Sequence, residues 1–226
     1  LLPRESQAGA AVRLRTLIVV FLAAQTLVAP HAHADSAKGG SETARTEFEV
    51  PSVKLSDGKA RPLCNLCELF GSALEEGLIA DAADRRWDQH SLLSAALVAS
   101  GVDTADRLEH YEQRVAQLAA ELGQSARAAK TPRQKADRVL EFLHRRVLYG
   151  QYSLDSTDLR LALDHGQYNC VSASVLFNWF ARRLGLRVCA LEKPGHAMSR
   201  VFLPETNLDV ETTCPDWFRL MNDPRR

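Results

Sequence analysis

The sequence predicts an α+β fold, in which a helical N-terminal region precedes one central helix packed on a small antiparallel sheet. Apolar residues recur at helical spacing through most of the chain up to Gly185, and beyond that glycine they form short alternating runs. Helices followed by strands, rather than interleaved with them, are typical of this class. The composition, 226 residues with 46% hydrophobic and 25% charged side chains, is that of a globular protein.

Residues 1–34 have the pattern of a cleaved export signal. Three arginines precede an apolar run over 17–29, and Ala32-His33-Ala34 has the A-x-A form of a cleavage site, so we expect the mature chain to begin at Asp35. The run is short for a membrane span, which needs about 20 residues. The sequence therefore predicts an exported protein, periplasmic or extracellular, with no stable membrane span after cleavage. The alternatives are an uncleaved anchor and a buried helix.

A flexible leader and a helical region are expected next. Residues 35–60 are polar and show little periodicity, which indicates the leader. The helical region covers 61–150. Pro62 suits the first turn of its first helix, Gly101 ends the second, and Thr104 can cap the third. The first three helices are expected over 62–74, 89–99 and 104–122.

The fourth helix and the core follow. Thr131-Pro132-Arg133-Gln134 is a capping-box pattern with proline at the first helical position, and the helix runs to Val147. The core is expected over 151–226 and begins with a short helix that ends near Gly166. The central helix starts at Cys170, and its apolar face is Val171, Val175, Leu176, Trp179, Phe180 and Leu184. Three antiparallel strands are expected over 187–191, 196–203 and 208–211, with a turn at Pro194-Gly195.

A cysteine, a histidine and acidic residues follow one another in the order that thiol chemistry requires. Cys170 opens a helix, where free N–H groups and the macrodipole favour a thiolate. His196, on a strand, could form an ion pair with the thiolate and later protonate a leaving amine. A carboxylate on the other ring nitrogen would hold the ring and its tautomer. The alternative is that neither residue is catalytic, the cysteine being a small buried side chain and the histidine a structural one.

Two acidic residues compete for the third position. Asp209 and Glu211 lie on the same face of their strand, so alternation does not separate them. A register with Glu211 opposite His196 centres the turn between Leu203 and Pro204, which favours Glu211 in a simple hairpin. Asp209 is the alternative third residue.

Other residues near the nucleophile are candidates for the cleft. The backbone N–H of Cys170 can serve an oxyanion site, with Gln167 as a helper. His165 and Tyr168 are close in sequence and either line the cleft or form a loop. Arg200 shares the strand face of His196, where a solvated or salt-bridged arginine is favoured over one that binds a substrate carboxylate.

Three motifs together resemble the transglutaminase-like superfamily of papain-type cysteine enzymes. They are Asn169-Cys170-Val171-Ser172-Ala173-Ser174, Gly195-His196 and Asp209-Val210-Glu211-Thr212-Thr213. Members often carry Asp-x-Thr at the third catalytic position, and Glu211-Thr212-Thr213 matches it with Glu for Asp. The resemblance covers about 159–217, and the helices before it look like those of a bacterial branch in which some members depart from the triad.

The five cysteines lead to a disulfide prediction. An exported protein with an odd number of cysteines leaves at least one thiol unpaired within the monomer, and a nucleophilic Cys170 must be that thiol. We then expect Cys64 to pair with Cys67, and Cys189 with Cys214. The residue after Cys67 is not histidine, which excludes a c-type haem site, and no second cysteine pair or histidine cluster supports zinc.

The sequence therefore predicts an exported transglutaminase-like cysteine enzyme that hydrolyses amides or transfers acyl groups through a thioester on Cys170. Its substrate is expected to be a protein or peptide, and no metal or organic cofactor is implied. Zero net charge gives no electrostatic case for nucleic acid, and no oligomeric state is indicated. One alternative is a non-catalytic protein- or peptide-binding module that retains the fold. Another is a thiol–disulfide protein acting through Cys64 and Cys67.

Overall fold

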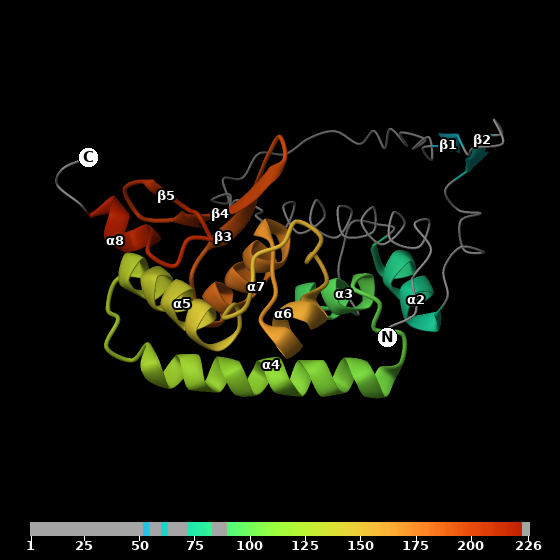
Figure 1. The fold of residues 1–226 in the computed structure, drawn as a ribbon, viewed down its shortest axis with the longest axis horizontal. Helices are drawn as coiled ribbons and strands as arrows, with labels where there is room; N and C mark the ends of the chain where they lie inside the picture. The colour runs from blue at the N-terminus through green and yellow to red at the C-terminus, as the bar shows by residue number, and fades with distance from the viewer. Residues whose placement is uncertain (1–51, 55–59, 63–71, 83–89, 223–226) are drawn as a thin grey trace, which may run out of the picture.

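The computed structural model describes residues 52–54, 60–62, 72–82 and 90–222, which form an α+β fold (Figure 1). This confirms the predicted fold class. The helices are α2 (Ala73–Ala82), α3 (Leu92–Ala99), α4 (Ala105–Ser125), α5 (Pro132–Arg146), α6 (Leu159–His165), α7 (Cys170–Arg183) and α8 (Trp217–Met221). The strands are β1 (Ser52–Lys54), β2 (Ala60–Pro62), β3 (Val188–Lys193), β4 (His196–Phe202) and β5 (Asn207–Val210), of which the last three form an antiparallel sheet in the order β3-β4-β5.

Helix α7 lies at the centre of the fold. Helices α3 and α5 pack against it, as do strands β3 and β4 (Figure 1). The sequence predicted one apolar face for this helix, but burial extends further and includes the polar side chains of Ser172, Ser174 and Asn178. The physical reason is that helices and sheet together surround α7. Apolar residues from α3 through α8 form one continuous hydrophobic core around it.

Local capping signals position the helices around α7. The predicted capping box of α5 is present: the Gln134 N–H donates to Thr131 Oγ1 at 3.2 Å, and the Thr131 N–H donates to Gln134 Oε1 at 3.1 Å. Gly166 ends α6 in the left-handed region, with φ of 71°. Thr104 occupies the N-cap position of α4, but its side chain makes no cap hydrogen bond, so that predicted interaction is wrong.

The region before α2 differs from the sequence prediction where the structure describes it. Residues 52–54 pair with 60–62 as antiparallel strands, in a segment predicted to be mostly an unstructured leader. Pro62 is the last residue of β2, and a strand end tolerates proline because no backbone N–H is needed there. Most of the helix predicted over 62–74 lies outside the described residues. The export signal and the Cys64–Cys67 pair lie outside the described residues. Within the described segments, no helix is long and apolar enough to span a membrane.

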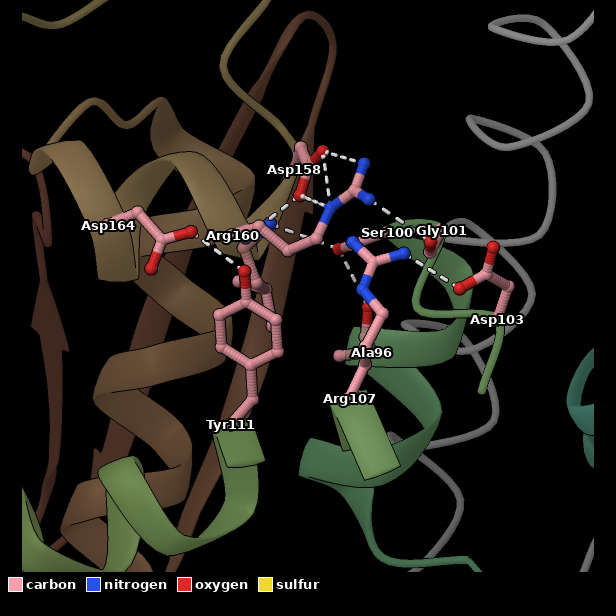
Figure 2. Close-up of polar contacts among 10 residues, drawn as sticks. Ala96, Ser100, Gly101, Asp103, Arg107, Tyr111, Asp158, Arg160 and Asp164 are labelled. Carbon is pink, nitrogen blue, oxygen red and sulfur yellow. Dashed lines mark hydrogen bonds and ion pairs between the residues drawn. The ribbon is translucent and has the colours of Figure 1, made fainter. Parts of the chain in front are cut away.

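A polar junction joins the end of α3 to the start of α6 (Figure 2). The guanidinium of Arg160 pairs with Asp158 at 2.6 Å and donates to the Gly101 carbonyl at 3.1 Å. The Leu159 N–H donates to Ser100 Oγ at 3.0 Å, so the first backbone donor of α6 is satisfied by a side chain from α3. These bonds fix the start of the helix that leads into the Cys170 region.

The long helix α4 is fastened to the other end of α6. Figure 2 shows the Tyr111 hydroxyl pointing at Asp164, to which it donates at 2.7 Å. Burial raises the pKa of Tyr111 to about 12, and the hydrogen bond to Asp164 adds to the rise, so the phenol keeps its proton at neutral pH. Arg114 also pairs with Asp164 at 3.2 Å and donates to the Leu163 carbonyl. The helical region and the core are therefore joined by specific polar contacts.

Candidate active site

Cys170 is the first residue of α7, as the sequence predicts. Asn169 caps the helix: its Oδ1 accepts the N–H groups of Val171 at 3.0 Å and Ser172 at 3.1 Å. Ser172 Oγ in turn accepts the Asn169 N–H at 3.0 Å, which completes a capping box. Cys170 is 8% exposed and stands at the positive end of a buried helix.

The two capping residues also bind the loop that precedes α6. Asn169 Nδ2 donates to the Leu154 carbonyl at 3.0 Å and to Thr157 Oγ1 at 2.7 Å. Ser172 Oγ donates to the Ser156 carbonyl at 2.9 Å. The start of α7 is therefore fixed both by its own capping box and by hydrogen bonds to residues 154–157. These bonds hold the backbone that carries Cys170 in place.

A short backbone ladder continues this attachment. The Gly150 N–H donates to the Gly166 carbonyl at 3.0 Å, the Tyr168 N–H donates to the Gln151 carbonyl at 3.3 Å, and the Ser153 N–H donates to the Tyr168 carbonyl at 3.0 Å. The two strands of this ladder approach closely at the glycines. A Cβ on Gly166 would lie 2.7 Å from the Gly150 nitrogen, closer than real Cβ contacts. Glycine at position 166 is therefore required by space as well as by its positive φ.

Substitution of Gly166 by alanine should destabilise the protein more than the same change at Gly185. Both glycines have positive φ, 71° and 76°, so both variants carry the strain of a left-handed alanine, about 1–2 kcal/mol. Only at Gly166 would the new Cβ also meet atoms under 3.0 Å away, the backbone of Gly150 and the ring of Tyr149; at Gly185 nothing lies within 4 Å. Urea unfolding at 25 °C should give a loss of about 3 kcal/mol or more for Gly166→Ala. Equal losses would contradict the close approach.

Tyr152, which the sequence did not single out, lies beside the candidate nucleophile. Its ring meets the ring of Tyr168 edge-on, with centroids 5.9 Å apart, two residues before Cys170. Burial raises the pKa of Tyr152, and Cys170 and Glu211 raise it further. Cys170 and Glu211 therefore both influence one phenol. The pairing that brings Tyr152 here joins distant segments, so no local pattern could reveal it.

The other predicted cleft residues are distributed around this phenol. Tyr168 is buried, and its ring packs against those of Tyr152 and His144, so it supports Tyr152 from within the protein. Burial raises the pKa of Tyr168. Gln167 and His165 are exposed at the end of α6. Tyr152, whose pKa Cys170 raises, is therefore a stronger candidate for the cleft than the exposed Gln167.

His196 and Glu211 form a hydrogen-bonded pair. Nε2 of His196, the first residue of β4, lies 2.6 Å from Glu211 Oε2. The other carboxylate oxygen accepts from the Thr213 hydroxyl at 2.7 Å and from the Thr213 N–H at 3.2 Å. With Nε2 turned to the carboxylate, Nδ1 is the ring nitrogen left for other chemistry. Because α7 packs on β4, His196 lies on the strand against which the helix of Cys170 rests, and Glu211 lies just after the neighbouring strand β5.

The surroundings of Glu211 keep its carboxyl ionised. Burial by itself would raise the pKa of Glu211. The hydrogen bonds from Thr213 and His196, together with the charge of the imidazole, outweigh burial and lower the pKa below its usual value. A charged carboxylate beside His196 is the arrangement that stabilises an imidazolium.

Asp209, the alternative acid, pairs with Arg200 instead. Its two oxygens accept from the guanidinium at 2.6 and 2.9 Å, and the two residues lie opposite each other on β5 and β4. The predicted register, with Glu211 opposite His196, is wrong: continuing the observed pairing places Glu211 across from Met198. A two-residue shift keeps a side chain on the same face, so Glu211 still reaches His196 diagonally. The salt-bridged role favoured for Arg200 is confirmed.

The chain segment that carries Glu211 is clamped from two helices. Thr212 is fully buried, and its hydroxyl lies 2.9 Å from Ser174 Oγ on α7. Its carbonyl lies 3.0 Å from Nε2 of His144 on α5. Burial lowers the pKa of His144, although its hydrogen bond to Thr212 opposes the shift, so a neutral ring that donates from Nε2 fits this contact. These contacts hold the backbone next to Glu211 in place.

The predicted disulfide between Cys189 and Cys214 is wrong. Both thiols are free, as is Cys170. Cys189 lies on β3 opposite Arg200, whose side chain faces β5, whereas Cys214 lies near Tyr168 beyond the end of the sheet. The two thiols therefore have different neighbours. The sequence had suggested a disulfide between the strand of Cys189 and the segment that follows Glu211.

The fold and these contacts define a class of protein. A thiol at the start of a buried helix, packed on an antiparallel sheet that carries a histidine–carboxylate pair, is the layout of the cysteine protease and transglutaminase type of fold. A family model described as the transglutaminase-like superfamily matches residues 109–214, so this part of the chain is a transglutaminase-like superfamily domain. The match begins within α4. Neither the curated proteins nor the solved structures compared with the chain gave a significant match.

Proposed function

We propose that the chain is an exported cysteine enzyme that hydrolyses amides or transfers their acyl groups through a thioester on Cys170. One observation carries this proposal: His196 is hydrogen-bonded to Glu211 at 2.6 Å on the strand against which α7, the helix that begins at Cys170, is packed. This arrangement supports a single site for the thiol, the imidazole and the carboxylate. Export rests on the signal pattern of residues 1–34.

The proposed reaction has two steps. The Cys170 thiolate attacks the amide carbonyl, the carbon–nitrogen bond breaks, and the amine leaves with a proton from His196. A thioester remains on Cys170. Water or a second amine then attacks the thioester and gives its proton to His196, which releases the acyl product and restores the thiolate. Glu211 holds the imidazole in orientation and stabilises its protonated form.

Tyr152 supports the same chemistry in two ways. Its hydroxyl can donate to the sulfur during the attack on the amide, because Tyr152 lies on Tyr168, two residues before Cys170. Once the sulfur is acylated, the hydroxyl is free to donate to the oxygen that develops negative charge, together with the backbone N–H of Cys170. In this proposal Tyr152 takes the helper role that the sequence assigned to Gln167.

Thiol labelling tests this proposal directly. Brief treatment with iodoacetamide near pH 6.5, followed by mass-spectrometric peptide mapping, should modify Cys170 first. Cys189 is more exposed than Cys170, but burial raises the pKa of its thiol. Labelling governed by exposure would therefore favour Cys189, and labelling governed by thiolate content favours Cys170.

The matched variant is His196→Ala, which should slow the labelling of Cys170 and leave that of Cys189 unchanged. Slow labelling of Cys170 in the native protein, at the rate of an ordinary buried cysteine, would contradict the enzyme proposal. The binding-module interpretation of the fold would then replace it.

A further inference from the structure

Exposed apolar side chains are concentrated in the segment that is hydrogen-bonded to the residues just before Cys170. Within the described segments, four large hydrophobic residues are strongly exposed, and three of them lie in the six-residue stretch 149–154. These are Tyr149, Tyr152 and Leu154, with 59%, 41% and 77% of their surface exposed. The fourth, Met221, is 48% exposed and lies on α8. Such clusters mark binding surfaces, because leaving apolar area in water is unfavourable unless a ligand covers it.

This cluster, which we call the 149–154 patch, stands on a rigid support. The ladder from Gly150 to Ser153 binds it to the backbone just before Cys170, and the Leu154 carbonyl accepts from Asn169, the residue next to the nucleophile. The Tyr149 ring lies over Gly166, where an added Cβ would meet it at 2.9 Å. The patch is therefore fixed in position relative to the thiol and needs no ordering when a ligand binds.

The position of the patch relates it to one part of a substrate. The Leu154 carbonyl binds Asn169, the neighbour of Cys170, and the Tyr152 ring packs on that of Tyr168, so a group bonded to the sulfur lies next to the patch. The leaving amine must approach His196, on the sheet, to take its proton. The acyl part of the substrate therefore contacts the 149–154 patch. Glu211 is already paired with His196, and Asp158 with Arg160, so apolar contact is the main means of recognition that the patch itself offers.

Resting on the proposed function, we propose that the 149–154 patch is the acyl-side subsite and selects peptides with an aromatic or aliphatic side chain at the residue whose carbonyl is attacked. Leu154 contributes the most exposed apolar surface, and the two tyrosines contribute ring faces at low cost in side-chain entropy. The substrate class is therefore a peptide amide with Phe, Tyr or Leu on the acyl side of the scissile bond.

Peptidyl chloromethyl ketones test the preference, because they alkylate the nucleophile while their side chain occupies the acyl subsite. Acetyl-Phe and acetyl-Leu probes should inactivate Cys170 at least about tenfold faster than acetyl-Gly, acetyl-Glu or acetyl-Lys probes, as expected for burial of one large apolar side chain. Rates are measured on the full chain by mass spectrometry of the Cys170 peptide.

Variants at the surface provide the controls. Leu154→Ser should bring the ratio of the Phe to the Gly rate toward one, Leu154→Phe should keep it high, and Met221→Ser, which removes an exposed apolar side chain on α8, should not change it. Fast iodoacetamide labelling of Cys170 with equal rates for all probes would overturn this inference alone. Slow iodoacetamide labelling would overturn the proposed function and this inference with it.

Discussion

Replacing Glu211 with glutamine should lower amide turnover by about 10⁴, the loss that follows the equivalent change in a serine-protease triad. Glutamine has nearly the same shape as glutamate, but it carries no charge to stabilise the imidazolium and can hold the ring in the wrong tautomer. The contact at stake is the one of 2.6 Å between Glu211 Oε2 and His196 Nε2. The measurement is kcat on a peptide amide with an apolar acyl residue, with circular dichroism to show that the variant is folded.

The matched control is Asp209→Asn. This change weakens the pair with Arg200, which is about one-third exposed on both sides, and should leave turnover within a few-fold of the native value. A larger loss from Asp209→Asn than from Glu211→Gln would transfer the catalytic role to Asp209 and contradict the observed pairing.

The Glu211→Gln variant should also differ from the native protein in how its stability responds to acid. Because the folded-state pKa of Glu211 is lowered, its carboxylate contributes stability that is present above the unfolded value of about 4.3. This contribution is lost as pH falls through the folded-state pKa. Urea unfolding at pH 7 and pH 3 should therefore show a smaller loss of stability for Glu211→Gln than for the native protein. An equal loss in both would show that the hydrogen bonds of Glu211 do not favour its charged form.

Replacing Asn169 with alanine should destabilise the protein by about 2–4 kcal/mol. Loss of an N-cap costs about 0.5–2 kcal/mol. The variant also leaves the Leu154 carbonyl and the Thr157 hydroxyl without the amide that binds them, at about 1–2 kcal/mol more. Because Asn169 precedes the nucleophile, the labelling rate of Cys170 should fall as well. Urea unfolding and iodoacetamide labelling measure the two effects.

Thr131→Ala is the control for this substitution. Among the described helices, Thr131 also forms a capping box, at the exposed start of α5. It should cost only about 1 kcal/mol and leave Cys170 labelling unchanged. Similar losses at the two positions would mean that the bonds from Asn169 to the preceding loop contribute nothing to stability.

The sequence by itself determined the parts of this protein that depend on neighbours along the chain. The capping box at Thr131, the glycine that ends α6 and the start of α7 at Cys170 all follow from patterns a few residues long. The placement of His196 at the start of β4 follows from the turn at Pro194-Gly195 before it. These features bring the candidate nucleophile and base onto the correct elements.

Only the tertiary structure decided which distant residues meet. Alternation along a strand determines the face of a side chain, but a two-residue change of register keeps that face and changes the partner. That is why Glu211 was assigned to the correct face but to the wrong cross-strand position. The contact of Tyr152 with Tyr168 and the separate surroundings of Cys189 and Cys214 have the same origin. Each depends on how segments far apart in sequence pack around α7, and a local pattern carries no information about that packing.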